Sequence, residues 1–415
     1  MFNNNFEYKD KGYSNAPSTR EVSRHRWYYY KEGFSKDLVE KGIQSYDLNK
    51  DSIIIDPFNG SGTVTLTAAE NGISSYGFEV NPFTSFVSKA KTLNANIHKL
   101  NIELNNVVNG IEKGANSKLE NFSTFTENKV NTEKWLFNKE VLQAFEGGLN
   151  KVLDKRTNVS KLIKLLLLNS AMENCNAKKD GKCVRYKKDW ELIGYDKSSF
   201  LNSFIENAEK VKNDITTNIS IRPHIISGDV RKKLSVLDSN YDFCITSPPY
   251  LNTFDYTDIY RPELFMGQFV NSYEELYSLR LKTVRSHVQA KWSLSKKDDF
   301  GLLFGKTISE IEKNKDGIRH KQIIPMIYAY FEDMENVLTK LSIKAKKNAH
   351  LWIIVSTSAY ANVHLPVDLI LADIATQNGW KLKEVGVLRD IIKRKSKYSP
   401  DIGKLRESLI ILEKK

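Results

Sequence analysis

The sequence predicts an α/β protein built on a doubly wound, mostly parallel β-sheet that is interrupted by helical insertions. The block SIIID at 52–56 is a β-branched run that ends in an acid, which predicts a buried parallel strand. A glycine-rich turn follows it, then a helix in TVTLTAAENG (63–72) and a second strand in SSYGFEVNP (74–82). The order strand, glycine turn, helix, strand is typical of the start of such a sheet.

The later segments alternate between helical and extended patterns. Helical periods dominate from about 100 to 218 and again from about 258 to 345. Extended patterns return in HIISGDV (224–230), YDFCITSPPY (241–250), AHLWIIVST (349–357) and ESLIILEK (407–414). We therefore expect one sheet in three parts with two insertions between them: sheet-forming parts at 20–100, 221–262 and 346–415, and helical insertions at 101–220 and 263–345.

The charge balance favours a polyanionic partner. The chain carries 62 Lys and Arg against 50 Asp and Glu, a formal charge of +12. Basic side chains bind phosphates by releasing condensed counterions, so this surplus predicts nucleic acid, although a merely basic enzyme stays an alternative.

The cysteines and the hydropathy pattern restrict the class further. Three cysteines without a C-x-x-C spacing exclude a complete disulfide framework and give no structural zinc site, so no metal is expected. The start of the sequence has no apolar signal-peptide core, and no stretch approaches 18 apolar residues. We expect a cytoplasmic protein with no membrane partner.

The first candidate site is the turn DPFNGSGT at 56–63. Glycines between a strand and a helix let the backbone approach a ligand at the positive end of the helix. No Gly-Lys-Ser/Thr follows, which excludes a P-loop, and Thr65 stands where a dinucleotide motif needs its third glycine. Glu79, at the end of the next strand, can hold two ribose hydroxyls, so the pattern suits an adenosine-bearing cofactor. A tight turn without a ligand is the alternative.

The second candidate site is TSPPY at 246–250, directly after the strand at 241–245. Two consecutive prolines cannot continue a hydrogen-bonded ladder, so the strand must end there with free carbonyl groups. A small hydroxyl, rigid carbonyls and an aromatic ring at this edge of the sheet make a site for a planar amine. Alone the motif is a weak signal, but its occurrence with DPFNGSGT is a strong one.

Together the two motifs resemble those of the amino-group DNA methyltransferases, D-P-F-x-G-S-G-T and (D/N/S)-P-P-(Y/F). The segment HRWYYYKEGFSKDLV (25–39) is similar to the one that precedes the cofactor loop in this family, and EVNP (79–82) and Gly228-Asp229 match further family positions. The resemblance covers about 120 residues. It implies a Rossmann-like class I methyltransferase sheet whose last strand is antiparallel, S-adenosylmethionine as cofactor, and double-stranded DNA as partner, with a cognate restriction endonuclease as a further candidate partner.

The resemblance also implies roles for individual residues. Glu79 would hold the ribose and Asp229 the adenine amine of the cofactor. Ser247 and the Pro248 carbonyl would accept hydrogen bonds from the target amine, and Tyr250 would stack on the flipped base. The expected cofactor-binding set is Asp56, Pro57, Phe58, Gly60, Ser61, Gly62, Thr63, Glu79, Asn81, Asp229 and Thr246, and the expected catalytic set is Ser247, Pro248, Pro249 and Tyr250.

The motifs also bear on the target base. The lone pair of a base amine is delocalised into the ring. Hydrogen bonds that the amine donates to the motif free the lone pair to attack the sulfonium methyl, without a covalent intermediate. Carbon-methylating cytosine enzymes need a Cys after Pro, and the sequence has no Pro-Cys dipeptide; Cys244 lies inside a strand, as a buried structural thiol. Ser at the first motif position is typical of cytosine enzymes and Asp is commoner in adenine enzymes, which favours cytosine and leaves adenine as the alternative.

Basic segments in the two insertions are candidates for DNA contact. KKDGKCVRYKK (178–188) holds six basic residues and one acid, so we expect a flexible basic loop that touches phosphates, with Arg185 in reach of guanine. RLKTVRSHVQAK (280–291) is the second candidate, and a solvated charged face is the alternative for both. The expected DNA-binding residues are Lys178, Lys182, Arg185, Lys187, Arg280 and Arg285, while Asp255, Tyr256 and Glu263 are candidates for the wall of the target pocket.

Three other functions remain open from the sequence. An RNA amino-group methyltransferase can share the P-P-Y logic, although no familiar RNA-binding module accompanies it. A nicotinamide-dependent oxidoreductase lacks support because the third glycine is missing. A binding module without activity would not need both motifs intact. The cofactor loop precedes the catalytic motif, which is not the commonest order for T-S-P-P-Y enzymes, so the resemblance does not locate the recognition domain.

Overall fold

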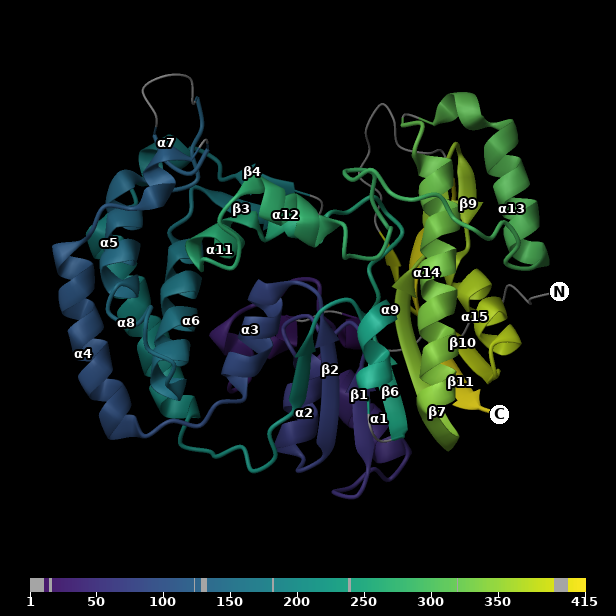
Figure 1. Ribbon diagram of the computed structural model, residues 1–415, viewed down its shortest axis with the longest axis horizontal. Coiled ribbons are helices and arrows are strands. Elements are labelled where there is room, and N and C mark those ends of the chain that lie inside the picture. Colours follow the sequence, from purple (N-terminus) through teal and green to yellow (C-terminus); the bar gives the residue numbers. More distant parts are fainter. Residues whose placement is uncertain are drawn as a thin grey trace.

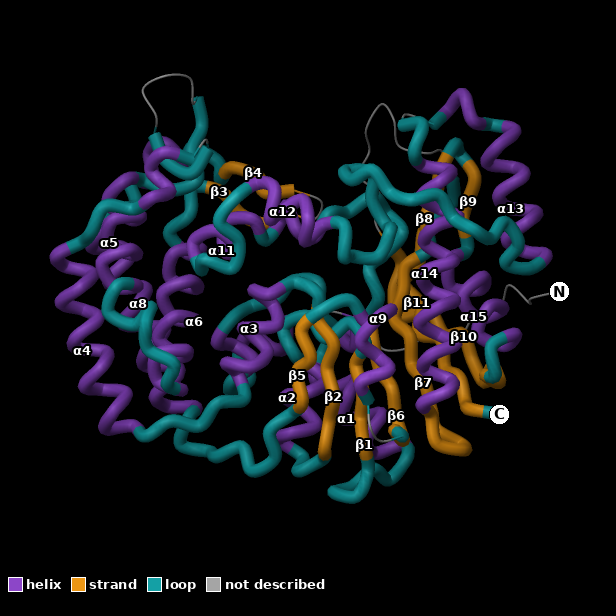
Figure 2. The backbone as a smooth tube through the Cα atoms, viewed as in Figure 1, coloured by secondary structure: helices purple, strands orange, loops and turns teal. Residues whose placement is uncertain are grey.

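The computed structural model describes residues 11–14, 17–122, 124–127, 133–180, 183–237, 240–318, 320–391 and 402–415. Its centre is a seven-stranded sheet in the order β10-β11-β7-β6-β1-β2-β5 (Figures 1 and 2). The strands are β1 (Ile53–Asp56), β2 (Ser74–Glu79), β5 (His224–Ser227), β6 (Tyr241–Thr246), β7 (Ala345–Ser356), β10 (Trp380–Ile391) and β11 (Leu405–Lys414).

The sheet is parallel except at one strand. β1 pairs in parallel with β2 and β6, β2 with β5, and β6 with β7. β11 lies between β7 and β10 and is antiparallel to both. This is the class I methyltransferase sheet that the resemblance implied, with its last strand antiparallel as expected, so the predicted fold class is confirmed.

Both faces of the sheet are covered, which explains why the central strands β1 and β6 are rich in buried apolar residues. Ile54 packs on one face with the helices before and after β1, whereas its neighbour Ile55 packs on the other face. The first face is covered by α1 (Lys36–Ser45) and α2 (Thr63–Glu70), and the second by α9 (Val230–Lys233), α14 (Ile323–Lys344) and α15 (Val367–Gln377). α3 (Pro82–Lys91) joins the β2–β5 edge to the helical lobe described next.

A helical lobe stands beside the β5 edge (left in Figure 1). Its helices are α4 (Ile97–Lys113), α5 (Lys139–Leu149), α6 (Asn158–Glu173), α7 (Trp190–Ile193) and α8 (Lys197–Asp214). Within it the expected basic loop at 178–188 is instead largely a hairpin of β3 (Ala177–Asp180) and β4 (Cys183–Tyr186). Pairing of Lys178 with Arg185 places both side chains on the same face of this hairpin.

The segment expected as the second insertion, 263–345, is divided between two places. Its first part, with α11 (Arg261–Met266) and α12 (Tyr273–Arg280), shares the hydrophobic core of the helical lobe, as does α10 (Tyr256–Ile259), which precedes the segment. α13 (Leu302–Lys313) and α14 pack with the sheet instead (right in Figure 1). The remaining elements are the hairpin β8 (Ser358–Tyr360) and β9 (Val363–Leu365) and the 3-10 helices Lys11–Ser14, Pro17–Arg20, His25–Trp27, Lys118–Asn121, Leu234–Val236 and Lys315–Gly317. Of the helices described, none is both long and apolar enough to cross a bilayer.

Candidate active site at the carboxyl edge of the sheet

A cavity of about 940 Å³ lies where the parallel strands end. Ligands of open α/β sheets bind at this edge, because the loops that follow the strands converge there. The cavity brings together most of the predicted cofactor and catalytic residues. Its lining includes Asp56, Pro57, Phe58, Gly60, Ser61, Thr63, Glu79, Asn81, Asp229, Ser247, Pro248, Pro249 and Tyr250.

Glycine is required at the two positions of the cofactor loop for different structural reasons. Gly60 has φ +50°, and a Cβ there would stand 3.1 Å from the Tyr30 ring, which lines the cavity. Gly62 has φ +88°, and its Cβ would stand 2.3 Å from the Ser88 hydroxyl of α3. Gly62 does not line the cavity, so its absent side chain serves the packing of α2 against α3. Gly60 is the position at which the loop faces the cavity.

Two carboxylates face the cavity, the buried Asp56 and the half-buried Glu79. The Glu79 oxygens accept hydrogen bonds from the backbone N–H groups of Gly60 (2.7 Å) and Asn81 (2.8 Å). Asp56 accepts from the backbone N–H of Phe58 (3.0 Å) and from the Thr246 hydroxyl (2.7 Å), which ties the end of β1 to the end of β6. Burial raises the pKa of each carboxyl group to about 7.

These carboxylates fit S-adenosylmethionine. Among the described residues, no Lys or Arg forms an ion pair with Asp56 or Glu79. Burial without a cation disfavours the ionised form, and a ligand that brings positive charge restores it. S-adenosylmethionine is cationic at its sulfonium and its ammonium group, and its ribose hydroxyls are donors for a carboxylate.

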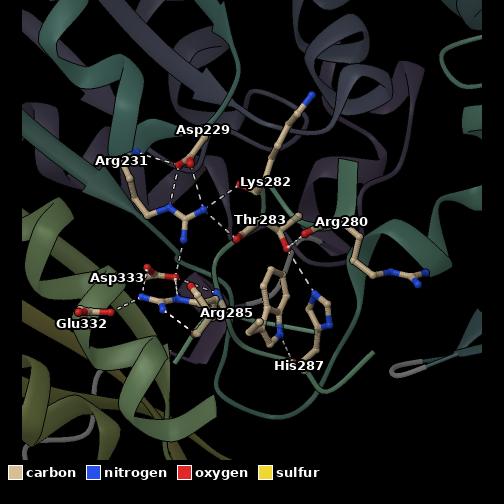
Figure 3. Close-up of polar contacts among 11 residues, drawn as sticks. Asp229, Arg231, Arg280, Lys282, Thr283, Arg285, His287, Glu332 and Asp333 are labelled. Atoms are coloured by element: carbon tan, nitrogen blue, oxygen red, sulfur yellow. Dashed lines mark hydrogen bonds and ion pairs between the residues drawn. The ribbon is translucent and has the colours of Figure 1, made fainter. Parts of the chain in front are cut away.

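Asp229 directly precedes α9, and several hydrogen bonds hold its carboxylate in place. Its oxygens accept from the backbone N–H and the guanidinium of Arg231 at 2.9 to 3.0 Å (Figure 3). Arg231 also pairs with Asp333 of α14 and donates to the carbonyl groups of Lys282 and Thr283. This network fixes the carboxylate at the cavity wall and connects it to the segment after α12. Its contact with the adenine amine stays a prediction.

The catalytic motif places its polar groups in a row. The Ser247 hydroxyl donates to the Tyr250 hydroxyl over a long 3.4 Å, and Tyr250 donates to Glu407 of β11 at 2.5 Å. Ser247, Pro249 and Tyr250 are half-buried and line the cavity. Cys244 lies in β6, before the motif, and is fully buried. Burial raises the pKa of its thiol well above the usual range, as fits a structural thiol.

The roof of the cavity comes from two segments distant in sequence. Tyr30 and Glu32 of the 25–39 segment line it, and Tyr30 stacks on Tyr260 with ring centroids 5.3 Å apart. Of the three candidates for the target-pocket wall, Tyr256 lines the cavity. Asp255 and Glu263 do not: Asp255 pairs with Arg280, and Glu263 is fully buried against Tyr28 and Lys179.

The structure separates the DNA-contact candidates into two groups. In the hairpin, Lys178 is exposed, Arg185 is 55% exposed beside Asp180, and Lys187 donates to Tyr195; Lys182 lies outside the described residues. After α12, Lys282 is exposed and lines the cavity.

Arg280 and Arg285 do not lie on an open surface. Arg280 is held by Asp255 at 2.6 Å. Arg285 is only 8% exposed and binds both Asp333 and Glu332 of α14 (Figure 3). Their cations are already neutralised by folded-state partners, so we no longer expect either to bind phosphate.

Sequence reasoning missed Glu407, which lines the cavity opposite the catalytic motif. A usable signal was present. Glu407 is the first residue of the predicted strand ESLIILEK, and an antiparallel strand begins at the edge where its parallel neighbours end. Glu407 pairs in register with Ser356 near the end of β7, which brings it to the catalytic motif.

Comparison with known proteins gives one family and several relatives along most of the chain. Residues 3–89 match the model of the N6/N4 methyltransferase family, described as DNA methylase. The chain is 27% identical to the type II methyltransferase M.BsoBI of Geobacillus stearothermophilus, over 96% of this chain and 87% of the relative. It is 24% identical to M.AvaI of Nostoc sp. over 89% and 82%, and 20% identical to M.MvaI of Kocuria varians over 90% and 84%.

Proposed function

We propose that this chain, an S-adenosylmethionine-dependent DNA methyltransferase of the amino-group class, methylates the N4 amine of a cytosine flipped out of a specific duplex sequence. The observation that carries the proposal is that the DPFNGSGT loop and the SPPY motif line one cavity. Ser at position 247 supports cytosine over adenine. The relatives support a place in a type II restriction–modification pair, with an endonuclease of the same specificity as partner.

In this proposal the cofactor lies along the loop after β1. Glu79 holds the ribose, Asp56 and the Gly60 backbone shape the floor, and Asp229 receives the adenine amine. Bound S-adenosylmethionine supplies an electrophilic methyl group. The chain contributes alignment of the amine with that methyl group, which is worth a large share of the barrier when both reactants are held in place.

The target amine lies at the end of β6 in this proposal. Its two hydrogens are donated to the Ser247 hydroxyl oxygen and to the Pro248 carbonyl, which localises the nitrogen lone pair. Tyr250 stacks on the flipped base, and Tyr256 lies in the same wall. Because the amine is buried in duplex DNA, the base must leave the stack, at a cost of roughly a few kcal/mol.

The test is to identify the product base. Incubation with duplex DNA and isotopically labelled cofactor, followed by mass spectrometry of the nucleosides, should give N4-methylcytosine. Label in N6-methyladenine would identify adenine as the target base in place of cytosine, and the enzyme class would stay the same. Label in a parallel reaction with total cellular RNA, and none in the DNA, would contradict the proposal.

DNA contact is proposed for the β3–β4 hairpin and for the segment after α12, which lines the cavity at 282–284 and 286–287. Lys178→Ala and Lys282→Ala should weaken binding to all duplexes and each lower the slope of log affinity against log salt by roughly 0.9, because one phosphate contact is lost. Arg185→Ala should instead reduce discrimination between sites, by about 1–3 kcal/mol if it reads guanine. Fluorescence anisotropy over a salt series measures both quantities.

Lys50→Ala is the matched control for this series. Lys50 is an exposed lysine just before β1, at the edge of the sheet opposite the cavity. Its removal changes the net charge by the same amount and should leave the slope unchanged. Equal slopes for the wild type, Lys178→Ala and Lys282→Ala would place the DNA on another face.

A further inference from the structure

Glu407 is a buried carboxylate in the cavity that no step described so far uses. It is 3% exposed, and one oxygen accepts from the Tyr250 hydroxyl at 2.5 Å. The other oxygen accepts from the Arg389 guanidinium at 2.8 Å. Arg389 lies directly opposite Glu407 on β10, so the pair is built into the register of β10 and β11.

This arrangement fixes the direction of every hydrogen bond up to Ser247. Glu407 forms an ion pair with Arg389, and a carboxylate in an ion pair can only accept hydrogen bonds. Tyr250 must therefore donate to Glu407, and because a phenol has one hydrogen, its oxygen can only accept from Ser247. The single hydrogen of Ser247 then points to Tyr250, and the serine lone pairs are left for another donor.

We infer that Glu407 is a positioning residue that acts through Tyr250 to hold Ser247 as a hydrogen-bond acceptor, so that the site selects a base with an exocyclic amine over its keto analogue. The inference deepens the proposed function and rests on it. An amine donates to the serine oxygen, whereas a keto oxygen at the same place meets lone pairs. Without the fixed direction, the serine hydroxyl rotates and donates to a keto oxygen equally well.

The test compares binding of an amino base and its keto analogue. Two duplexes carry cytosine or uracil at the target position opposite an abasic site, so that neither base has a pairing partner to lose. Affinities are measured with S-adenosylhomocysteine present, which permits no transfer. The wild type should prefer the cytosine duplex by roughly tenfold or more, because the keto base leaves a buried acceptor unpaired.

Glu407→Gln should lower this preference at least about threefold, since an amide can present either a donor or an acceptor to Tyr250, and the Pro248 carbonyl, which only accepts, should keep a residual preference for the amine. Tyr250→Phe keeps the ring and removes the hydroxyl that connects Glu407 to Ser247, so it should lower the preference for cytosine by the same factor. Affinity for a duplex with an abasic site at the target position should stay at the wild-type value in both variants, which a general defect in folding would not allow.

Glu413→Gln is the matched control. Glu413 forms an ion pair with Lys383 at 2.7 Å on the same two strands, at the end remote from the cavity. This variant should keep the wild-type preference. A wild type without preference would overturn the inference, and so would a full preference retained in either Glu407→Gln or Tyr250→Phe.

Failure of the inference and failure of the proposed function are distinguishable. If the product analysis shows methyladenine, the same measurement is made with adenine and hypoxanthine, which differ in the same way at the reacting edge. The choice of cytosine then fails while the role of Glu407 is still decided by the ratio of affinities.

Discussion

Ser247→Ala should slow methyl transfer by a factor of about 100 to 1,000, the usual effect of deleting one hydrogen bond that acts on the reacting group. The reason is local. Ser247 follows β6 directly and lies in the cavity, where its oxygen is the side-chain acceptor proposed for the target amine. Single-turnover rates with saturating enzyme and one duplex measure the transfer step itself.

Two binding measurements separate this effect from a damaged fold. S-adenosylmethionine affinity by calorimetry should be nearly unchanged, because Ser247 is not among the groups proposed to hold the cofactor. Fluorescence of 2-aminopurine beside the target should still report base flipping. Full turnover by Ser247→Ala would assign the amine to the Pro248 carbonyl alone and would remove the main reason for preferring cytosine.

Gly60→Val should abolish measurable binding of S-adenosylmethionine. Its Cβ would press against the Tyr30 ring at 3.1 Å, and its methyl groups would occupy the cavity where the backbone N–H of Gly60 meets Glu79. The left-handed φ of +50° adds a conformational cost of roughly 1–2 kcal/mol for a residue with a side chain. Calorimetry with purified protein gives the affinity directly.

Gly72→Val separates strain from occlusion. Gly72 follows α2 with φ +67°, and a Cβ there meets nothing within 4 Å. Both variants carry the same backbone penalty, so both should melt at a lower temperature than the wild type. Only Gly60→Val should lose the cofactor. Loss of binding in both variants would show that loop stability, and not the space beside Tyr30, controls the site.

The parts of the fold near the motifs could be predicted because local sequence determines them. The β1–α2–β2 unit needs a β-branched strand, glycines at positive φ and a helix, all within 30 residues, and the structure has each in place. β10 could not be predicted in the same way. Its sequence WKLKEVGVLRDI mixes lysines and acids because β10 is one of the two edge strands, with one neighbour instead of two.

The sequence did not indicate the ion pairs that hold Arg280 and Arg285. Arg285 has a basic sequence context, and nothing near it in sequence indicates Asp333, which lies 48 positions further on and meets it only after α14 has packed. Charge in a sequence predicts a partner of opposite sign but not whether the partner is intramolecular. Tyr250 shows the same limit, since its motif predicts a ring for stacking and gives no hint of the Glu407 contact.

The position of β11 has a consequence for the order in which the protein becomes competent during synthesis. The cofactor loop lies early in the sequence, whereas Glu407 comes 157 residues after Tyr250. At a translation rate of roughly 5–20 residues per second, on the order of ten seconds separate the appearance of these two partners. A nascent chain therefore contains the groups proposed to hold the cofactor before it contains the group proposed to orient Ser247. In this proposal, selectivity for the base is acquired later in synthesis than the capacity to bind the cofactor.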